Sequence, residues 1–260
     1  MKDPVSLGFI GGGRITRIIL EGFRRKGKEF AEIVVSDVSE EALARIRAIS
    51  PRARTVLGNN RSPAACDLVF LALHPPACGA ALEEIKGTLK PDAVLISLAP
   101  KVTSARILEK LGGFMRVCRM IPNAPSIVGA GYNPITYPPA LGNQEGAAIS
   151  EILATLGECP EVPEKDLEAY AILAAMGPTY FWFQWEELEL LGAGFGLSGE
   201  DARKALAGMV DGAAKAYFRS ELPTGEVMDL VPVKPMKDDE EDIRSKSRSK
   251  LKPLYERLKP

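Results

Sequence analysis

The 260-residue sequence contains one histidine, His74, and this scarcity limits the chemistry that the chain can carry. A zinc site with several histidine ligands is excluded, and a Ser-His-Asp triad would have to use this single residue. The four cysteines have no Cys-x-x-Cys pair and no metal-ligand spacing; they are Cys66, Cys78, Cys118 and Cys159. We therefore expect reduced, buried thiols, no metal site and a cytoplasmic protein.

An excess of charge of either sign is also lacking, because 33 lysines and arginines face 34 aspartates and glutamates. Nucleic-acid phosphates bind to surplus cations, so the composition predicts no nucleic-acid partner. With 46% hydrophobic and 26% charged residues, the chain has an ordinary globular composition, which excludes wholesale disorder. Its length predicts one or two domains.

A long uninterrupted hydrophobic run is missing as well. The apolar start, residues 5–10, is too short for the core of a secretory signal and continues directly into three glycines. The most hydrophobic stretch, residues 169–185, is interrupted by a Gly-Pro pair and followed by two glutamates. A buried helical hairpin explains this stretch better than a membrane span, so we expect no membrane partner.

Short apolar runs alternate with helical periodicity up to about residue 159. Strands are expected at residues 5–10, 33–36, 68–73, 94–98, 117–120 and 131–136, and helices at 14–26, 39–49 and 79–89. Uninterrupted apolar strands separated by helices predict a parallel sheet covered on both faces. After Pro163 only helices are expected, at residues 166–176, 179–191 and 199–220. Ser39 and Ser198 are the predicted N-caps, and the charged end, 237–260, fits either a thinly anchored helix or a partly disordered tail.

The sequence Gly-Gly-Gly-Arg-Ile at residues 11–15 lies between the first strand and the first helix, where a dinucleotide fingerprint must lie. Gly11 would make the tight turn, and Gly13 would let the backbone approach a pyrophosphate. The helix beginning near Arg14 would point its N–H groups at the phosphates. A merely structural turn is the alternative, but the strand-turn-helix context favours dinucleotide binding.

Asp37 follows the second strand, where a carboxylate accepts hydrogen bonds from the adenosine ribose and repels a 2′-phosphate. It therefore slightly favours NAD(H), although Arg14 beside the phosphates would tolerate NADP(H). Asp37 could instead cap the next helix together with Ser39. Asn60 could reach the same ribose or serve only as a turn asparagine.

The sequence Leu73-His74-Pro75 follows the fourth strand. Ligands of open α/β sheets bind beyond the carboxyl ends of the strands, so this loop should border a nicotinamide ring. His74 could donate a proton, hold the cofactor or substrate, or have no role. The predicted cofactor-binding residues are Gly11, Gly13, Arg14, Ile15, Asp37, Asn60, Leu73, His74 and Pro75, with His74 also the candidate catalytic residue.

A second cluster occupies residues 119–125 with the sequence Arg-Met-Ile-Pro-Asn-Ala-Pro. Its two prolines bracket Asn123, which predicts a rigid loop with one amide that can both donate and accept hydrogen bonds. Together with the fingerprint, residues 70–75 and the Gly-Pro-Thr-Tyr sequence at 177–180, this cluster resembles the pyrroline-5-carboxylate reductases and the wider reductase group that shares their N-terminal domain. The resemblance covers most of residues 5–230.

The resemblance implies an α/β Rossmann-like N-terminal domain with a parallel sheet, residues 1–160, that holds NAD(P)H. An all-α C-terminal domain, residues 161–260, would complete the substrate pocket and form a homodimer or higher homo-oligomer. The implied reaction is hydride transfer to the C=N bond of pyrroline-5-carboxylate, or of a related imine or ketone. The implied substrate-binding residues are Asn123, Met176, Gly177 and Pro178.

Four segments depart from this family. His74-Pro75 replaces Lys-Pro, Pro100-Lys101 replaces Ala-Gly, and residues 174–176 read Ala-Ala-Met instead of Ser-Gly-Ser. The loop that receives the substrate carboxylate in the family is replaced at residues 232–238, where Lys234 or Lys237 could restore a positive partner. Two other functions therefore stay open: a catalytically silent nucleotide-binding regulatory protein, and a deazaflavin-linked NADP oxidoreductase.

Overall fold

The computed structural model describes residues 4–259. The chain divides into two compact units, one running up to residue 176 and including the residues from 255 on, the other comprising residues 177–254. Residues 161–176 contribute to the first unit, because Val162, Leu167 and Ala171 pack with Ile121 in a small buried cluster. The helical end of the chain returns to the same cluster through Leu258.

A seven-stranded sheet forms the centre of the first unit, in the order β3–β2–β1–β4–β5–β6–β8. The strands are β1 (Ser6–Ile10), β2 (Glu32–Asp37), β3 (Arg54–Leu57), β4 (Leu68–Leu71), β5 (Val94–Ser97), β6 (Val117–Met120) and β8 (Ile135–Thr136). Every neighbouring pair is parallel except β6–β8, which is antiparallel. The predicted Rossmann-like parallel sheet is therefore confirmed, with the strand order reversing between β1 and β4.

The expectation that residues 131–136 extend this sheet is wrong for their first part. β7 (Gly131–Tyr132) pairs with β9 (Gly157–Glu158) in a separate two-stranded sheet. The two backbones come so close that a Cβ atom on Gly157 would lie 2.1 Å from the carbonyl oxygen of Gly131. Glycine at this position allows the pairing, and only Ile135–Thr136 joins the main sheet.

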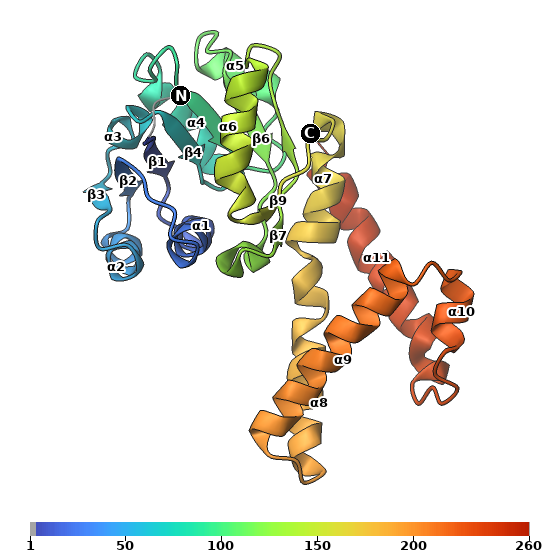
Figure 1. The fold of residues 1–260 in the computed structure, drawn as a ribbon. Helices are drawn as coiled ribbons and strands as arrows, with labels where there is room; N and C mark the ends of the chain where they lie inside the picture. The colour runs from blue at the N-terminus through green and yellow to red at the C-terminus, as the bar shows by residue number, and fades with distance from the viewer. Residues whose placement is uncertain (1–3, 260) are drawn as a thin grey trace. The chain divides into compact units, whose positions relative to one another are not determined.

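Helices cover both faces of the main sheet, and successive strand residues point to opposite sides (Figure 1). In β4, Leu68 and Phe70 face one core and Val69 and Leu71 face the other. The first core includes side chains of α1 (Arg14–Arg25), α2 (Glu40–Ile49) and α6 (Asn143–Ala154). The second includes those of α3 (Arg61–Ala64), α4 (Pro75–Ile85) and α5 (Ser104–Lys110).

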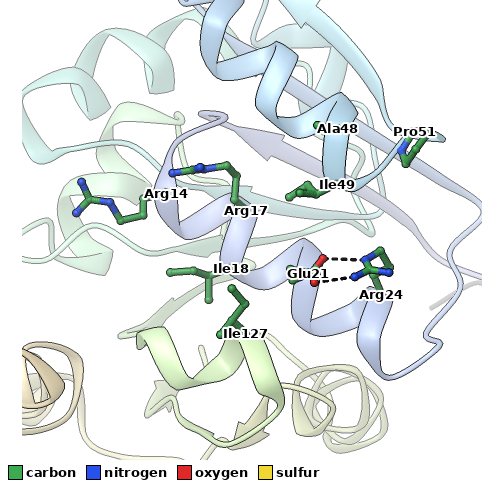
Figure 2. A pocket seen from close by; sticks show the side chains of 9 residues that line it. All are labelled: Arg14, Arg17, Ile18, Glu21, Arg24, Ala48, Ile49, Pro51 and Ile127. Carbon is green, nitrogen blue, oxygen red and sulfur yellow. Dashed lines mark hydrogen bonds and ion pairs between the residues drawn. The ribbon is translucent and has the colours of Figure 1, made fainter. Parts of the chain in front are cut away.

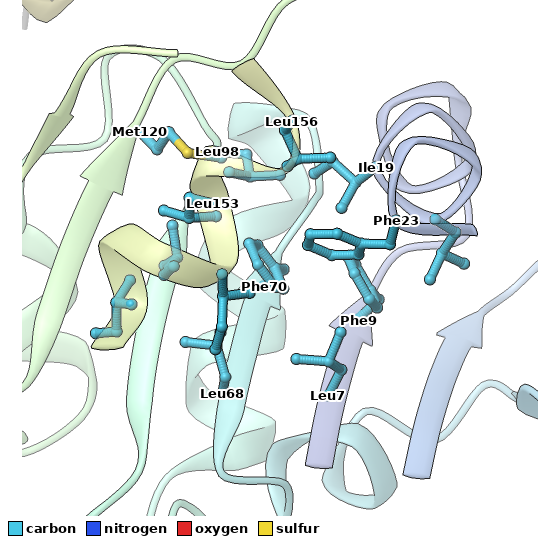
Figure 3. Close-up of a cluster of buried hydrophobic side chains, with 14 of the residues drawn as sticks. Leu7, Phe9, Ile19, Phe23, Leu68, Phe70, Leu98, Met120, Leu153 and Leu156 are labelled. Atoms are coloured by element: carbon cyan, nitrogen blue, oxygen red, sulfur yellow. The ribbon is translucent and has the colours of Figure 1, made fainter. Parts of the chain in front are cut away.

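Aromatic stacking lies at the centre of the first core (Figure 3). The rings of Phe9 and Phe70, from adjacent strands, stack with centroids 4.7 Å apart, and Ile19 and Phe23 of α1 belong to the same buried cluster. The helix expected at 79–89 begins earlier, at Pro75, because proline at the first helical position has a backbone angle suited to a helix. The four cysteines are free thiols, and burial raises the pKa of Cys118 to about 12.

The second unit is helical throughout its described secondary structure. Its elements are η4 (Gly177–Tyr180), α8 (Trp182–Gly194), α9 (Gly199–Arg219), α10 (Thr224–Asp229), η5 (Lys237–Asp239) and most of α11 (Glu240–Leu258). Ser198 caps α9 as predicted, since its hydroxyl accepts a hydrogen bond from the N–H of Asp201. The charged end of the chain was expected to form either a thinly anchored helix or a partly disordered tail, and the structure shows a helix.

The helical hairpin predicted to be buried at residues 169–185 has buried side chains only in its first part, at Ala171 and Ile172. No residue of α8 is buried, and Trp182 and Phe183 are 46% and 65% exposed. Hydrophobicity indicates that a segment needs a covering surface, but it does not say which surface covers it; here α8 is joined to α9 by an ion pair between Glu189 and Arg203. Within residues 4–259, none of the helices is both long and apolar enough to cross a membrane.

Candidate functional site

The glycine turn after β1 is shaped by a close approach to the end of β4. Gly11 has a φ of +104°, and a Cβ atom there would lie 2.5 Å from the carbonyl oxygen of Ala72 and 2.9 Å from Cδ2 of Leu73. Glycine is required at this position, because both the conformation and the space exclude a side chain. The hydroxyl of Thr16 donates a 2.6 Å hydrogen bond to the carbonyl of Gly11 and fastens α1 to the turn. The predicted residues Gly11 and Leu73 are thus brought together.

The amino end of α1 is open towards solvent. Gly13 is its N-cap and is exposed, and a Cβ atom there would meet no atom within 4 Å. The helix has no side-chain cap and no acidic residue in its first turn. Its first N–H groups therefore present a partial positive charge to whatever lies beyond the turn, with Arg14 exposed beside them. A diphosphate group fits this arrangement, because backbone can approach it at Gly13 without meeting a side chain.

Asp37 ties the end of β2 to the glycine turn. One carboxylate oxygen, Oδ2, accepts a 2.7 Å hydrogen bond from the N–H of Gly12, and Oδ1 accepts one of 2.8 Å from the N–H of Ser39. Ser39 itself caps α2 by accepting from the N–H of Ala42. Asp37 therefore supports the start of α2 and also lies directly against the turn.

Asn60 is held by partners from two other elements. Its Nδ2 donates to Oε2 of Glu84 at 2.7 Å, its backbone N–H donates to Oε1 of the same carboxylate, and its Oδ1 accepts from the hydroxyl of Ser36. Its amide thus links β2 to α4. The hydrogen bond from Ser36 places Asn60 at the end of β2, where Ser36 is the residue before Asp37.

His74 is the N-cap of α4, with Pro75 as the first helical residue. Its side chain is exposed, and within residues 4–259 it makes neither a hydrogen bond nor an ion pair. The loop follows β4, the strand next to β1, so it lies at the same edge of the sheet as the glycine turn.

Asn123 is 7% exposed and its side-chain amide both donates and accepts, as predicted for the rigid loop. Its Oδ1 accepts from the N–H of Tyr132 at 3.1 Å, and its Nδ2 donates to the carbonyl of Ala174 at 3.4 Å. Sequence analysis missed Asn133, which is fully buried and whose Oδ1 accepts from the N–H of Asn123. An isolated asparagine between two short strands carries no local signal of such a role.

The segment that contains Ala174 forms a π-helical turn, Ala171–Ala175, in which the N–H of Met176 donates to the carbonyl of Ala171 at 3.0 Å. Turns of this kind are frequent at functional sites, and periodicity did not reveal this one. The structure thus brings Asn123 into contact with Ala174, two residues before Met176. Gly177 and Pro178 begin the second unit.

An ion-pair network lies beside the loop of Asn123; its Arg119 and Glu168 are buried, and its Glu164 is partly exposed. Arg119, on β6, is 1% exposed, and its two terminal nitrogens bind Oε1 of Glu164 at 3.0 Å and Oε1 of Glu168 at 2.7 Å. Burial alone would raise the pKa of Glu164, but hydrogen bonds from the N–H of Ser104 and from Arg119 hold it below its usual value. Sequence analysis missed both glutamates, although an arginine within an apolar strand requires a buried anionic partner.

A groove of about 650 Å³ lies elsewhere, between α1, the end of α2 and Ile127 (Figure 2). Arg14 is the one predicted site residue that lines it. Farther along the groove, Glu21 pairs with Arg24, and hydrogen bonds from Arg24 and Arg25 lower its pKa to about 2. Within the described residues, no group of three or more histidine, cysteine, aspartate or glutamate side chains is arranged to hold a metal ion.

Comparisons with known proteins agree with this geometry. A family profile described as NADP oxidoreductase coenzyme F420-dependent matches residues 6–101. Over 216 residues the chain is 27% identical to pyrroline-5-carboxylate reductase 3 of Rattus norvegicus, covering 83% of this chain and 78% of that protein.

Two solved structures are similar over nearly the whole chain. A pyrroline-5-carboxylate reductase from Coxiella burnetii is 27% identical, has a TM-score of 0.71 and covers 98% of this chain and 95% of its own. The pyrroline carboxylate reductase of Plasmodium falciparum, solved with NADP bound, has a TM-score of 0.74 at 20% identity, covering 99% and 95%. The resemblance to the pyrroline-5-carboxylate reductases is confirmed, as is the Rossmann-like fold with a helical C-terminal region.

Proposed function

We propose that this chain, a relative of the pyrroline-5-carboxylate reductases in sequence and fold, uses NAD(P)H to reduce the C=N bond of pyrroline-5-carboxylate to proline. The observation that carries the proposal is the extent of the similarity, which runs through both the sheet and the helical region. The open glycine turn supports it, because it offers a diphosphate-binding surface at the edge of the sheet where dinucleotides bind.

The proposed roles of the site residues are the following. Gly11, Gly13, Arg14 and Ile15 hold the diphosphate at the amino end of α1. Asp37 and Asn60 lie on the ribose side, and Leu73, His74 and Pro75 border the nicotinamide, which supplies the hydride when the cofactor is bound. The proposed substrate contacts are Asn123, Met176, Gly177 and Pro178.

Proton transfer needs no side chain in this proposal. A general acid must be held within hydrogen-bond reach of the proton's destination, usually by a second partner that orients it. The ring of His74 is exposed and has no such partner in the described part of the chain. We therefore propose that His74 contacts the cofactor and that the imine arrives already protonated.

We further propose NAD over NADP. The carboxylate of Asp37 lies against the glycine turn, where it would repel a 2′-phosphate, and Glu84 adds a second carboxylate through its bonds to Asn60. Arg14 is the nearest argument for NADP, since its exposed cation adjoins the same turn.

The decisive assay follows NADH or NADPH oxidation, by absorbance, in the presence of pyrroline-5-carboxylate and detects proline as the product. Oxidation of both cofactors at the background rate would contradict the proposal and favour a silent nucleotide-binding protein. The profile that matches residues 6–101 supports a second candidate, a deazaflavin-linked NADP oxidoreductase. Reduction of NADP by reduced coenzyme F420 would identify that activity.

We also propose a homodimer built through the second unit. Among the described residues from 177 to 254, Gly177 and Ala202 are the buried ones, whereas Phe181, Phe195 and Phe218 are 51%, 81% and 78% exposed. Apolar exposure on this scale marks an interaction surface, because a single chain gains nothing from leaving aromatic rings in water. Sedimentation equilibrium at micromolar concentration should give twice the chain mass, and a stable monomer would contradict the dimer.

A further inference from the structure

Lys101 adopts a backbone conformation that non-glycine residues rarely take. Its φ is +68°, in the left-handed region, and it follows β5 by four residues. A side chain in this region costs roughly 1–2 kcal/mol, so the surrounding structure must hold the residue there. Strain of this kind often accompanies a functional position.

The ion-pair network of Arg119, Glu164 and Glu168 holds this loop at both ends. Oε1 of Glu168 accepts a 3.1 Å hydrogen bond from the N–H of Lys101, and Oε1 of Glu164 accepts one of 2.7 Å from the N–H of Ser104. Both carboxylates are bound by Arg119, whose position on β6 is paired with Ser97 at the end of β5. Two charged side chains and a paired strand thus fix the backbone of an exposed lysine.

Lys101 is exposed, and among the described residues its ammonium group has no carboxylate or carbonyl partner. The loop leaves the carboxyl end of β5, next to the end of β4, where the N–H of Leu98 donates to the carbonyl of Leu71. Ligands of such sheets bind beyond this edge. The loop that carries this unpaired cation therefore lies at the edge of the sheet where His74 begins α4.

We infer that Lys101 binds the carboxylate of the substrate and so selects imino acids over uncharged imines. This inference rests on the proposed function. The other candidates are weaker: Lys234 already pairs with Asp229 at 3.0 Å, and Lys237 lies on a short helical turn where its side chain has no partner among residues 4–259. A charge held in place loses less conformational freedom on binding than a free surface lysine does.

The test measures KM and kcat for pyrroline-5-carboxylate and for unsubstituted pyrroline, which has the same ring without the carboxylate. Lys101→Asn removes the charge while tolerating the left-handed conformation, and Lys101→Arg keeps the charge. We expect Lys101→Asn to raise KM for pyrroline-5-carboxylate by about 10- to 100-fold, as the loss of a charged hydrogen bond does. KM for unsubstituted pyrroline and kcat for both should change less than about 2-fold.

Lys237→Asn is the matched control and should leave both KM values unchanged, and Lys101→Arg should restore most of the affinity. An unchanged KM in Lys101→Asn, or an equal rise for both imines, would overturn the inference while leaving the proposed function intact. Calorimetric titration of the NAD⁺-loaded protein with L-proline gives a readout that needs no turnover. If the wild type reduces neither imine, the proposed function fails; weaker L-proline binding in Lys101→Asn would then still support the inference, and equal or absent binding would overturn it.

Discussion

The carboxylate of Asp37 accepts a 2.7 Å hydrogen bond from the backbone N–H of Gly12, which joins the last residue of β2 to the turn after β1. The same side chain supports the start of α2 through Ser39. Asp37 therefore shapes the proposed cofactor site and carries the charge that would discriminate between the two nicotinamide cofactors.

Replacing Asp37 with serine should lower the affinity for NADH and raise the affinity for NADPH relative to NADH. Loss of the two backbone hydrogen bonds should also reduce the free energy of unfolding by about 1–3 kcal/mol. Calorimetric titration with each cofactor measures the ratio, and urea denaturation measures the stability. An unchanged ratio together with lower stability would show that Asp37 acts only on the backbone.

Gly13 and Gly11 should respond to substitution in opposite ways. Gly13→Val adds its Cβ in open space, so the protein should still fold, with only the small loss of stability expected from valine at an N-cap; it should weaken NAD(H) binding at least about 10-fold by blocking approach to the diphosphate. Gly11→Ala should destabilise the fold, because its Cβ would clash with the carbonyl of Ala72 at a φ of +104°. Normal NAD(H) binding by Gly13→Val, in a protein with unchanged circular dichroism, would contradict the assignment of the turn.

His74→Gln should raise KM for NAD(P)H by a few-fold and leave kcat almost unchanged, because the ring contacts the cofactor and donates no proton in the proposed mechanism. Steady-state kinetics between pH 6 and pH 8 test this. If His74 were the proton donor, kcat would fall by about 10²–10⁴-fold and the pH profile would flatten. If neither parameter moved, Asn123 and the Gly177-Pro178 segment would become the better candidates.

Asp67 should make the free energy of unfolding depend on pH in the acid range. Burial favours the neutral carboxyl, but bonds from Lys90, from the hydroxyl of Ser6 and from the N–H of Ser6 outweigh it and lower the pKa from 3.8 to about 2. A carboxyl whose pKa is lowered by folding stabilises the protein fully above its unfolded pKa and loses this contribution as the pH falls through the folded value.

We therefore expect about 2 kcal/mol of the unfolding free energy to disappear between about pH 4.5 and pH 2. Asp67→Asn should be less stable than the wild type at pH 7 and should approach it at acid pH. Urea denaturation across this range gives the difference. A constant difference between the two proteins over the whole range would show that Asp67 has the same pKa in the folded and unfolded chains.

The local sequence pattern was sufficient to predict much of the sheet. The apolar runs that predicted β1, β4 and β5 correspond to strands buried in the two cores, and Ser39 and Ser198 cap their helices as predicted. These features depend on neighbours within a few residues, because strand burial and helix capping are set by local periodicity and local hydrogen bonds. The turn at Gly11 was predictable for the same reason.

Contacts between distant residues were not predictable in this way. Arg119 meets Glu168 across 49 positions of sequence, Asn123 finds Asn133 and Ala174, and residues 131–132 leave the main sheet for β9. The conformation of Lys101 also depends on a distant partner, since the carboxylate of Glu168 accepts the hydrogen bond from its N–H.

The sequence by itself determined the parallel sheet, the position of the glycine turn and the helical character of the C-terminal part, because each arises from hydrophobic periodicity or from one residue's backbone freedom. Only the tertiary structure decided that Asp37 supports the turn, that Arg119 and two glutamates hold the loop of Lys101, and that α8 stays exposed in a single chain. Each of these outcomes depends on which distant groups folding brings within hydrogen-bond distance, and on how little apolar surface the second unit can bury alone.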